Sequence, residues 1–463
     1  MDRIENRTYD ELQIGDSASI ARTLTNQDIE LFAVMSGDVN PAHVDPEFAK
    51  SDMFHKVVAH GMWGGALFST VLGTELPGPG TIYLGQTLRF KRAVGLGDTV
   101  TVSVRVAQKH PEHHRVTFDC TATNQRGETV IDGAAEANAP TEKISRARVV
   151  LPEVELRQQG HQYQRLIHQA KGLAAIRTAV VHPVDTVSLL GAVEAAKANI
   201  IVPVLVGPEA KIRAVAATAK IDLSPYELVA TEHSHAAAAA AAALARDHKV
   251  DALMKGSLHT DEFMGAIVGE EKLRTSRRMS HVLVIDAPGY PRPLFVTNAA
   301  INIYPTLDEK RDIILNAIEL AHALGVAEPR VAILSAVETV TEKIRSTLDA
   351  AALCKTADRR QITGGILDGP LAFDNAVSVE AAKTKGIVSP VAGRADIFVV
   401  PDLEAGNMLA KQLEYLAEAQ VAVIVLGARV PVILTSRADR TLARLASCAI
   451  ALLLAHHTQR LES

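Results

Sequence analysis

The residues most able to do chemistry are an aspartate and a histidine on either side of an Asn–Pro turn. Asp38 and His43 lie five residues apart in the stretch SGDVNPAHVD, with Asn40 and Pro41 between them. Because Asn–Pro favours a turn, the carboxylate and the imidazole can approach one point and act as general acid and general base. The alternative is that Asp38 only forms the turn and His43 is an ordinary loop histidine.

A backbone donor would complete such a site. Residues 60–76, HGMWGGALFSTVLGTEL, are apolar on nearly every side and predict a buried helix that begins at Gly61, with His60 shaping its entry. The first N–H groups of a helix have no partner within it, and a glycine lets a substrate oxygen come close. This donor could stabilise negative charge on a carbonyl oxygen while water adds to an activated double bond.

A second group of candidates lies in polar turns next to apolar runs of the second half. A hydroxyl and a guanidinium at a helix start can hold a tetrahedral oxyanion such as phosphate. An adjacent aspartate could take a proton from a thiol or orient the arginine. The bland alternatives are a solvated turn for the arginines and a helix cap for the serine. The candidates are Lys255, His259, Thr260, Arg274, Arg277, Ser436, Arg437 and Asp439.

The elements that position the first site have the signature of an antiparallel sheet around a helix. Residues 81–90, 97–106 and 115–122 alternate apolar and polar side chains, which predicts strands with one buried face. Residues 25–37 predict a helix with a threonine cap and a glycine stop. Residues 1–140 therefore predict an α+β hot-dog domain, and the charged, proline-bearing residues 141–158 predict a linker.

Residues 159–463 follow a different pattern. Short continuous apolar runs alternate with helical stretches such as the alanine-rich residues 235–248. Strands buried on both faces and separated by helices predict a mostly parallel α/β sheet, in which ligands bind at the carboxyl ends of strands. The predicted strands lie within residues 199–207, 250–256, 281–289, 330–336, 395–402 and 421–427.

Composition narrows the classes of partner. The 463 residues carry a net charge of −5, which argues against a nucleic-acid-binding surface. We find no signal-peptide pattern and no apolar stretch of the ~18 residues that a membrane span requires, so we expect a cytoplasmic protein without membrane contact. The three cysteines match no metal-ligand spacing, and no nucleotide-binding fingerprint follows a strand. We therefore expect no metal site and no bound cofactor.

The N-terminal motifs resemble a known family. GDVNPAHVD, VAHGMWGGALFSTVLG and PGPGTIYLGQTLRFKRAVGLGDTV are similar to the MaoC-like, (R)-specific enoyl-CoA hydratases over most of residues 10–140. The resemblance implies a dimeric hot-dog fold, with Asp38 and His43 as the hydration pair and Gly61 as the backbone donor. It also implies that Ser69 and Asn40 contribute to substrate binding and that coenzyme A enters beside the site. Which of Asp38 and His43 acts as the base stays open at this point.

The C-terminal motifs resemble a second family. ILDGPLAFDNAVS, GIVSPVAGRADIFVVPDLEAGNMLAKQL and VPVILTSRAD are similar to the phosphate acetyl/butyryltransferases over about residues 160–460. The resemblance implies a two-lobed α/β fold of the isocitrate dehydrogenase type, with Arg437 binding phosphate and Ser436 bonding the thiolate or carbonyl oxygen. In acetyl-specific members the acid lies further past the serine–arginine pair than Asp439 does, so the base is left open. Residues 253–263 and 273–286 look nearer to the butyryl-type branch, which leaves a longer acyl group open as well.

Together the two halves predict a bifunctional enzyme of coenzyme A thioesters. One domain would hydrate trans-2-enoyl-CoA reversibly to (R)-3-hydroxyacyl-CoA, and the other would transfer an acyl group from coenzyme A to inorganic phosphate. The substrates are acyl-CoA and phosphate, and we expect a homodimer or a larger homo-oligomer. The main alternative is a single acyltransferase whose hot-dog domain only binds acyl-CoA or dimerises. A second is a dehydrogenase related by fold, which no sequence feature supports.

Overall fold

The computed structural model describes residues 3–151, 154, 156, 160–435 and 441–462. The chain divides into two compact units, Met1–Leu156 and Arg157–Ser463, called here the N-terminal and C-terminal units. Each unit has its own hydrophobic core, so each is described by itself.

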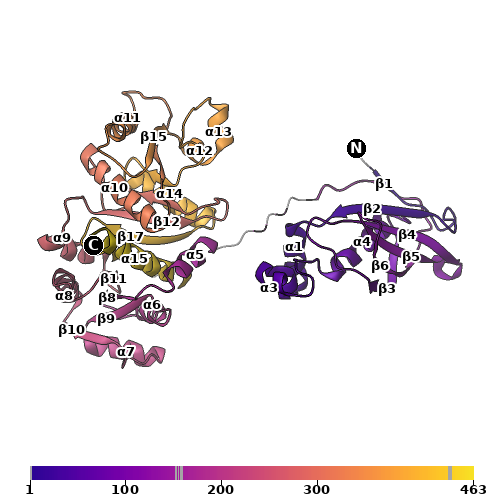
Figure 1. The fold of residues 1–463 in the computed structure, drawn as a ribbon, viewed down its shortest axis with the longest axis horizontal. Helices are drawn as coiled ribbons and strands as arrows, with labels where there is room; N and C mark the ends of the chain where they lie inside the picture. The colour runs from indigo at the N-terminus through magenta and orange to yellow at the C-terminus, as the bar shows by residue number, and fades with distance from the viewer. Residues whose placement is uncertain (1–2, 152–153, 155, 157–159, 436–440, 463) are drawn as a thin grey trace. The chain divides into compact units, whose positions relative to one another are not determined.

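The N-terminal unit is a five-stranded antiparallel sheet against which α4 packs (Figure 1). The strand order is β2-β4-β5-β6-β3, so β2 and β3 are the edges. The strands are β2 (Ser17–Thr23), β3 (Ile82–Phe90), β4 (Thr99–His110), β5 (Arg115–Asn124) and β6 (Thr129–Asn138). The helices are α1 (Asn26–Ser36), α2 (Pro41–Val44), α3 (Pro46–Ser51), α4 (Gly61–Thr74) and the 3₁₀ turn η1 (Glu112–His114). This is the predicted hot-dog arrangement.

Small residues let α4 lie close to the sheet. A Cβ on Gly64 would come 2.7 Å from Cδ1 of Ile131, and one on Gly65 would come 2.9 Å from Cδ1 of Leu88. The helix predicted at residues 25–37 is confirmed as α1, which the side chain of Thr25 caps and Gly37 ends in the left-handed conformation. Local capping thus sets where the Asp38 turn begins.

Part of the predicted linker is structured. Strand β7 (Ser145–Ala147) pairs antiparallel with β1 (Arg3–Glu5), and the N-terminal unit extends to Leu156. The sequence did not indicate this pairing, because a three-residue strand is too short to show an alternation of apolar and polar residues.

The C-terminal unit is an eleven-stranded mixed sheet with helices on both faces (Figure 1). The order is β10-β9-β8-β11-β18-β17-β12-β13-β16-β14-β15; β17 runs antiparallel to both neighbours, and β13 runs antiparallel to β12. One lobe holds β8 (Ile176–Val181), β9 (Ile201–Gly207), β10 (Glu227–Ala230), β11 (Ala252–Lys255) and β18 (Val432–Ile433). The other holds β12 (Ser280–Asp286), β13 (Leu294–Thr297), β14 (Arg330–Leu334), β15 (Ile366–Leu371), β16 (Ile397–Val399) and β17 (Gln420–Leu426). The two-lobed α/β fold is thus as predicted.

The helices of this unit connect its strands along the chain and cover the two faces of the sheet. They are α5 (His161–Ala170), α6 (Thr186–Lys197), α7 (Glu209–Ala219), α8 (Ser234–Arg246), α9 (Thr260–Gly269), η2 (Glu271–Leu273), α10 (Leu307–Ala323), α11 (Arg345–Asp358), α12 (Phe373–Val377), α13 (Val379–Thr384), α14 (Leu403–Leu416) and α15 (Thr441–Glu462). Among the described residues, α15 alone is long and apolar enough to cross a membrane, contrary to the sequence reading. Its apolar window is 61% buried, and it packs on α5 and β17 as a core helix does.

Candidate active sites

The turn that carries Asp38 is held by a chain of local hydrogen bonds. The Asp38 amide donates to Oγ of Ser36 (3.2 Å), and Oδ1 of Asp38 accepts from the Asn40 amide (3.1 Å). Oδ1 of Asn40 in turn accepts from the Ala42 amide (3.2 Å) and caps α2. Each polar residue therefore fixes the next, and the exposed Asp38 carboxylate keeps its second oxygen outside this chain of bonds.

Two histidines meet beside the Asp38 turn. The rings of His43 and His60 lie 4.0 Å apart between centroids, and one ligand-type atom from each of Asp38, His43 and His60 lies within 4.8 Å of the others. Nδ1 of His43 is 2.8 Å from the carbonyl oxygen of Val58, and Nε2 of His60 is 3.0 Å from the carbonyl oxygen of Asp38. A carbonyl oxygen can only accept, so each of these nitrogens carries the hydrogen. In the neutral rings, Nε2 of His43 and Nδ1 of His60 therefore hold free lone pairs.

The predicted backbone donor opens onto a cavity of about 330 Å³. His43, Gly61 and Phe90 are among the residues that line it. Gly61 is the first residue of α4, and among the described residues none accepts a hydrogen bond from its amide. The helix start thus offers an unpaired N–H near the imidazole of His43, as polarisation of a carbonyl requires.

The other two predicted residues lie at the margin of this site. Asn40 shapes the turn through its bond to Ala42 and does not line the cavity. Ser69 is exposed on α4, two turns beyond Gly61, and does not line the cavity either. The geometry within the chain therefore groups Asp38 with His43 and His60, while His43, His60 and Gly61 line the cavity, which Asp38 itself does not line.

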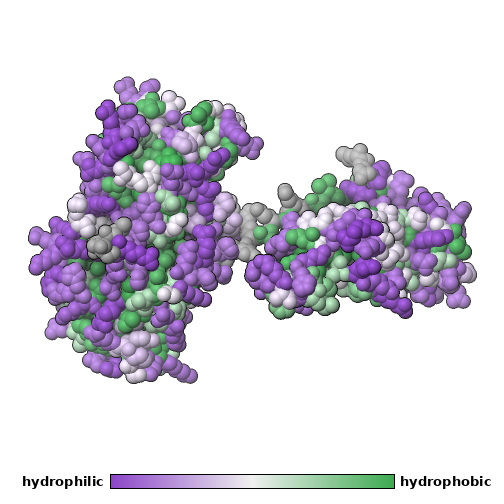
Figure 2. Space-filling model, viewed as in Figure 1, coloured by the Kyte–Doolittle hydropathy of each residue, from purple (hydrophilic) through white to green (hydrophobic). Residues whose placement is uncertain are grey.

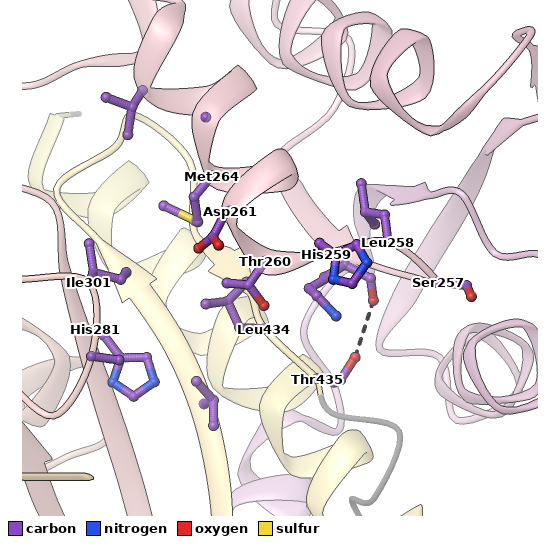
Figure 3. Close-up of a pocket in the computed structure, with 15 residues that line it drawn as sticks. Ser257, Leu258, His259, Thr260, Asp261, Met264, His281, Ile301, Leu434 and Thr435 are labelled. Atoms are coloured by element: carbon purple, nitrogen blue, oxygen red, sulfur yellow. Dashed lines mark hydrogen bonds between the residues drawn. The ribbon is translucent and has the colours of Figure 1, made fainter.

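The C-terminal unit contains a cavity of about 910 Å³ at the end of β11 (Figure 3). Lys255, His259 and Thr260 line it, as the sequence predicted for one site. Thr435, at the end of β18, donates from Oγ1 to the carbonyl oxygen of Lys255 (3.3 Å). Because β11 and β18 are parallel neighbours, their carboxyl ends meet at this edge of the sheet.

Two further residues of this cavity were missed from the sequence. His281 on β12 is 7% exposed, its Nδ1 has no hydrogen-bond partner among the described residues, and burial lowers its pKa to about 4. Ile301 has a φ of 70°, which is rare for a β-branched residue and marks backbone strain at the cavity wall. The one feature of the sequence that could have indicated His281 is its place directly before the apolar run VLVI of a predicted buried strand.

Comparisons with known proteins identify this unit. The family described as Phosphate acetyl/butaryl transferase matches residues 229–452. A phosphate acetyltransferase from Rhizobium meliloti is 61% identical over 298 residues, which cover 64% of this chain and 94% of the relative. The chain belongs to the phosphate acetyl/butyryltransferase family. A branched-chain phosphotransacylase from Enterococcus faecalis V583 has a similar structure, with 28% identity and a TM-score of 0.54, over 61% of this chain and 99% of that one.

This transferase family member carries a MaoC-like domain at its N-terminus. The MaoC like domain family matches residues 13–126. The structure of the R-hydratase PhaJ1 from Pseudomonas aeruginosa is 44% identical and covers 34% of this chain and 99% of that chain, with a TM-score of 0.33. The two family matches confirm the fusion expected from the two sets of motifs.

The arginines predicted for the transferase site lie elsewhere. Arg274 and Arg277 line a separate cavity of about 650 Å³, where Arg274 donates to the carbonyl oxygen of Val268 (2.7 Å) and Arg277 pairs with Glu319. They precede β12, which runs parallel to β11. They therefore lie at the amino-terminal ends of these strands, whereas Lys255 lies at the carboxyl end of β11. The structure therefore does not join them to the cavity of Lys255, His259 and Thr260.

Three further residues predicted for the transferase site belong to the segment that follows Thr435. Ser436, Arg437 and Asp439 lie outside the described residues, and their predicted roles stay predictions. Thr435 immediately precedes them and lines the 910 Å³ cavity. The last described residue before this segment therefore borders the 910 Å³ cavity.

Proposed function

We propose that the C-terminal unit transfers an acyl group between coenzyme A and inorganic phosphate, with acetyl-CoA as the preferred acyl donor. The observation that supports this most is the 61% identity to a phosphate acetyltransferase over nearly its whole length. A phosphate oxygen attacks the thioester carbonyl carbon, the C–S bond breaks, and the coenzyme A thiolate leaves and takes a proton. The 910 Å³ cavity is the place for this exchange, with Ser436 and Arg437 as the groups proposed to hold the oxyanions.

We propose that the N-terminal unit hydrates trans-2-enoyl-CoA to (R)-3-hydroxyacyl-CoA and catalyses the reverse reaction. Two observations support this function: Asp38 lies close to His43, and His43 shares a cavity with Gly61, whose amide has no acceptor among the described residues. Nε2 of neutral His43 has the free lone pair that can remove a proton from water as its oxygen attacks the β carbon. Asp38 accepts a hydrogen bond from the other O–H of that water, which stays on the oxygen and becomes the product hydroxyl, and Gly61 donates to the enolate oxygen. The imidazolium then returns its proton to the α carbon, which restores His43.

We also propose that copies of the chain associate through the β3 edge of the N-terminal unit. On this edge strand Ile82, Leu84 and Phe90 are 60%, 46% and 52% exposed. An open apolar edge is a template for pairing with another strand, and hydrophobic residues reach the surface of this unit (Figure 2). Light scattering of the wild type and of Ile82→Lys tests this, because only the wild type should have at least twice the chain mass. We separately propose that the protein is located in the cytoplasm.

One experiment tests both activities. Thiol release from acetyl-, propionyl- and butyryl-CoA with phosphate measures acyl transfer, and loss of crotonyl-CoA absorbance measures hydration. Asp38→Asn should abolish hydration and leave acyl transfer unchanged. Hydration that survives Asp38→Asn would exclude the proposed hydratase site, and a wild type without hydration would favour an acyl-CoA-binding or dimerising domain.

A further inference from the structure

Three groups that can bind a metal ion meet beside the Asp38 turn. Asp38, His43 and His60 each place one ligand-type atom within 4.8 Å of the other two, and the hydrogen bonds to carbonyl oxygens leave a lone pair on Nε2 of His43 and on Nδ1 of His60. Among the described residues, none donates a hydrogen bond to either free ring nitrogen. The cluster is therefore rich in lone pairs and poor in hydrogens.

His60 is the member that the proposed hydration does not use. It is 2% exposed, its ring contacts the rings of Phe32 and His43, and its buried Nδ1 has no partner in the described part of the chain. A buried polar atom without a partner destabilises the fold, so an occupant that pairs with it would be stabilising. A water molecule has two hydrogens and satisfies two of the three acceptors, whereas a metal cation accepts a lone pair from all three.

The chemistry of the three groups is that of a transition-metal site. Two imidazoles and one carboxylate are a common ligand set for divalent zinc and iron. Histidine ligands usually donate their other ring N–H to a carboxylate or a backbone carbonyl, which both histidines do here. Two cations that line the neighbouring cavity are already paired, Lys91 with Asp132 (3.5 Å) and Arg92 with Glu128 (3.8 Å).

We propose that Asp38, His43 and His60 bind one divalent transition-metal ion, for which Zn²⁺ is the probe, and that the bound ion blocks the N-terminal site. The ion takes the lone pair of His43 Nε2, which is then no longer free to receive a proton from water. Binding follows from the three ligands alone. Inhibition rests on the proposed hydratase function. The site departs from the sequence expectation of no metal, since its three ligands span 22 positions of the chain.

Zinc binding is measured directly on the full chain by equilibrium dialysis against Zn²⁺ followed by metal analysis. His60→Gln should bind one Zn²⁺ per chain fewer than the wild type. His55→Gln is the matched control, because His55 lies in the same unit outside the cluster and should bind as the wild type does. Equal zinc content in the wild type and His60→Gln would overturn the site.

Activity in the same samples tests the inhibition. One equivalent of Zn²⁺ should lower crotonyl-CoA hydration at least tenfold, a chelator should restore it, and acyl transfer should not change. Undiminished hydration in the zinc-loaded wild type would overturn the inhibition. A wild type that binds the extra zinc without hydrating crotonyl-CoA would support the metal site and refute the hydratase.

A second variant covers a folding failure of His60→Gln. The fluorescence of Trp63, the one tryptophan of the chain, reports the fold of the N-terminal unit. Should that signal be lost in His60→Gln, Asp38→Asn decides, because Asp38 is exposed and its replacement leaves the core intact. Wild-type zinc content in Asp38→Asn would overturn the site.

Discussion

The buried histidine of the C-terminal unit makes stability depend on pH. His281 is 7% exposed, and burial lowers its pKa from an ordinary 6.5 to about 4. Between these values the unfolded chain binds a proton that the folded chain does not bind, so stability falls as pH falls. The contribution of His281 is complete above pH 6.5 and is lost progressively as pH drops toward 4.

The size of the effect follows from the two pKa values. The full shift corresponds to about 3 kcal/mol, and by pH 5 about 2 kcal/mol of it is lost. His281→Gln removes the titrating group while keeping a polar side chain of similar size. The wild type should therefore lose about 2 kcal/mol more than His281→Gln between pH 7 and pH 5.

Hydrogen exchange of β12 amides measures this difference within one unit of the full chain. Exchange through global opening of the C-terminal unit gives its free energy of unfolding at each pH, after correction for intrinsic exchange rates. Peptides from β4 in the N-terminal unit serve as an internal control and should show the same pH dependence in both proteins. Equal losses of β12 protection in the wild type and His281→Gln would refute the buried, neutral histidine.

Two further predictions concern packing and thiol reactivity. Gly256→Ala should destabilise the C-terminal unit by about 1–3 kcal/mol, because the new Cβ would lie 2.4 Å from the Val181 carbonyl oxygen. Gly265→Ala, with nothing within 4 Å of the new Cβ, should not destabilise it, and protection of β11 amides from exchange compares the two. Burial raises the pKa of Cys120, Cys354 and Cys448 to about 12, so at pH 8 Ellman's reagent should react more than about 100-fold slower with the native chain than with the chain in urea. Fast reaction of a native thiol would contradict this.

Local signals in the sequence were enough to predict the Asp38 turn. The cap at Thr25, the stop at Gly37 and the Asn40 turn are interactions within a few residues, and the structure shows each of them. The part played by His60 was not predictable in the same way. Its bond to the Asp38 carbonyl spans 22 residues and depends on how α4 packs on the sheet.

Arg274 and Arg277, which precede β12, show that the direction of the strands is needed to decide which polar segments share a site. Residues 255–260 and 274–278 are close in sequence and both polar, which suggested one site. Helix α9 and its flanking turns return the chain to the start of a parallel strand, so the two groups occupy opposite edges of the sheet. The predicted alternation of strands and helices already implied this separation, whereas the antiparallel β17 between β18 and β12 could not be inferred from composition.

Gly61 and His43 differ in how strongly each residue indicates a catalytic role and not only a packing role. A Cβ on Gly61 would lie 3.2 Å from the ring of Phe90, so packing alone favours glycine there, and Gly61→Ala would disturb the fold as well as the donor. His43 is a clearer mark, because its Nδ1–H bond to Val58 could be replaced by many other donors, whereas a free Nε2 lone pair beside a carboxylate adds nothing to packing. A stabilised turn would not require that lone pair, but proton transfer would, and a metal ion would use the same pair of electrons. The two proposals for this site therefore compete for one nitrogen, which is why the zinc experiment bears on both.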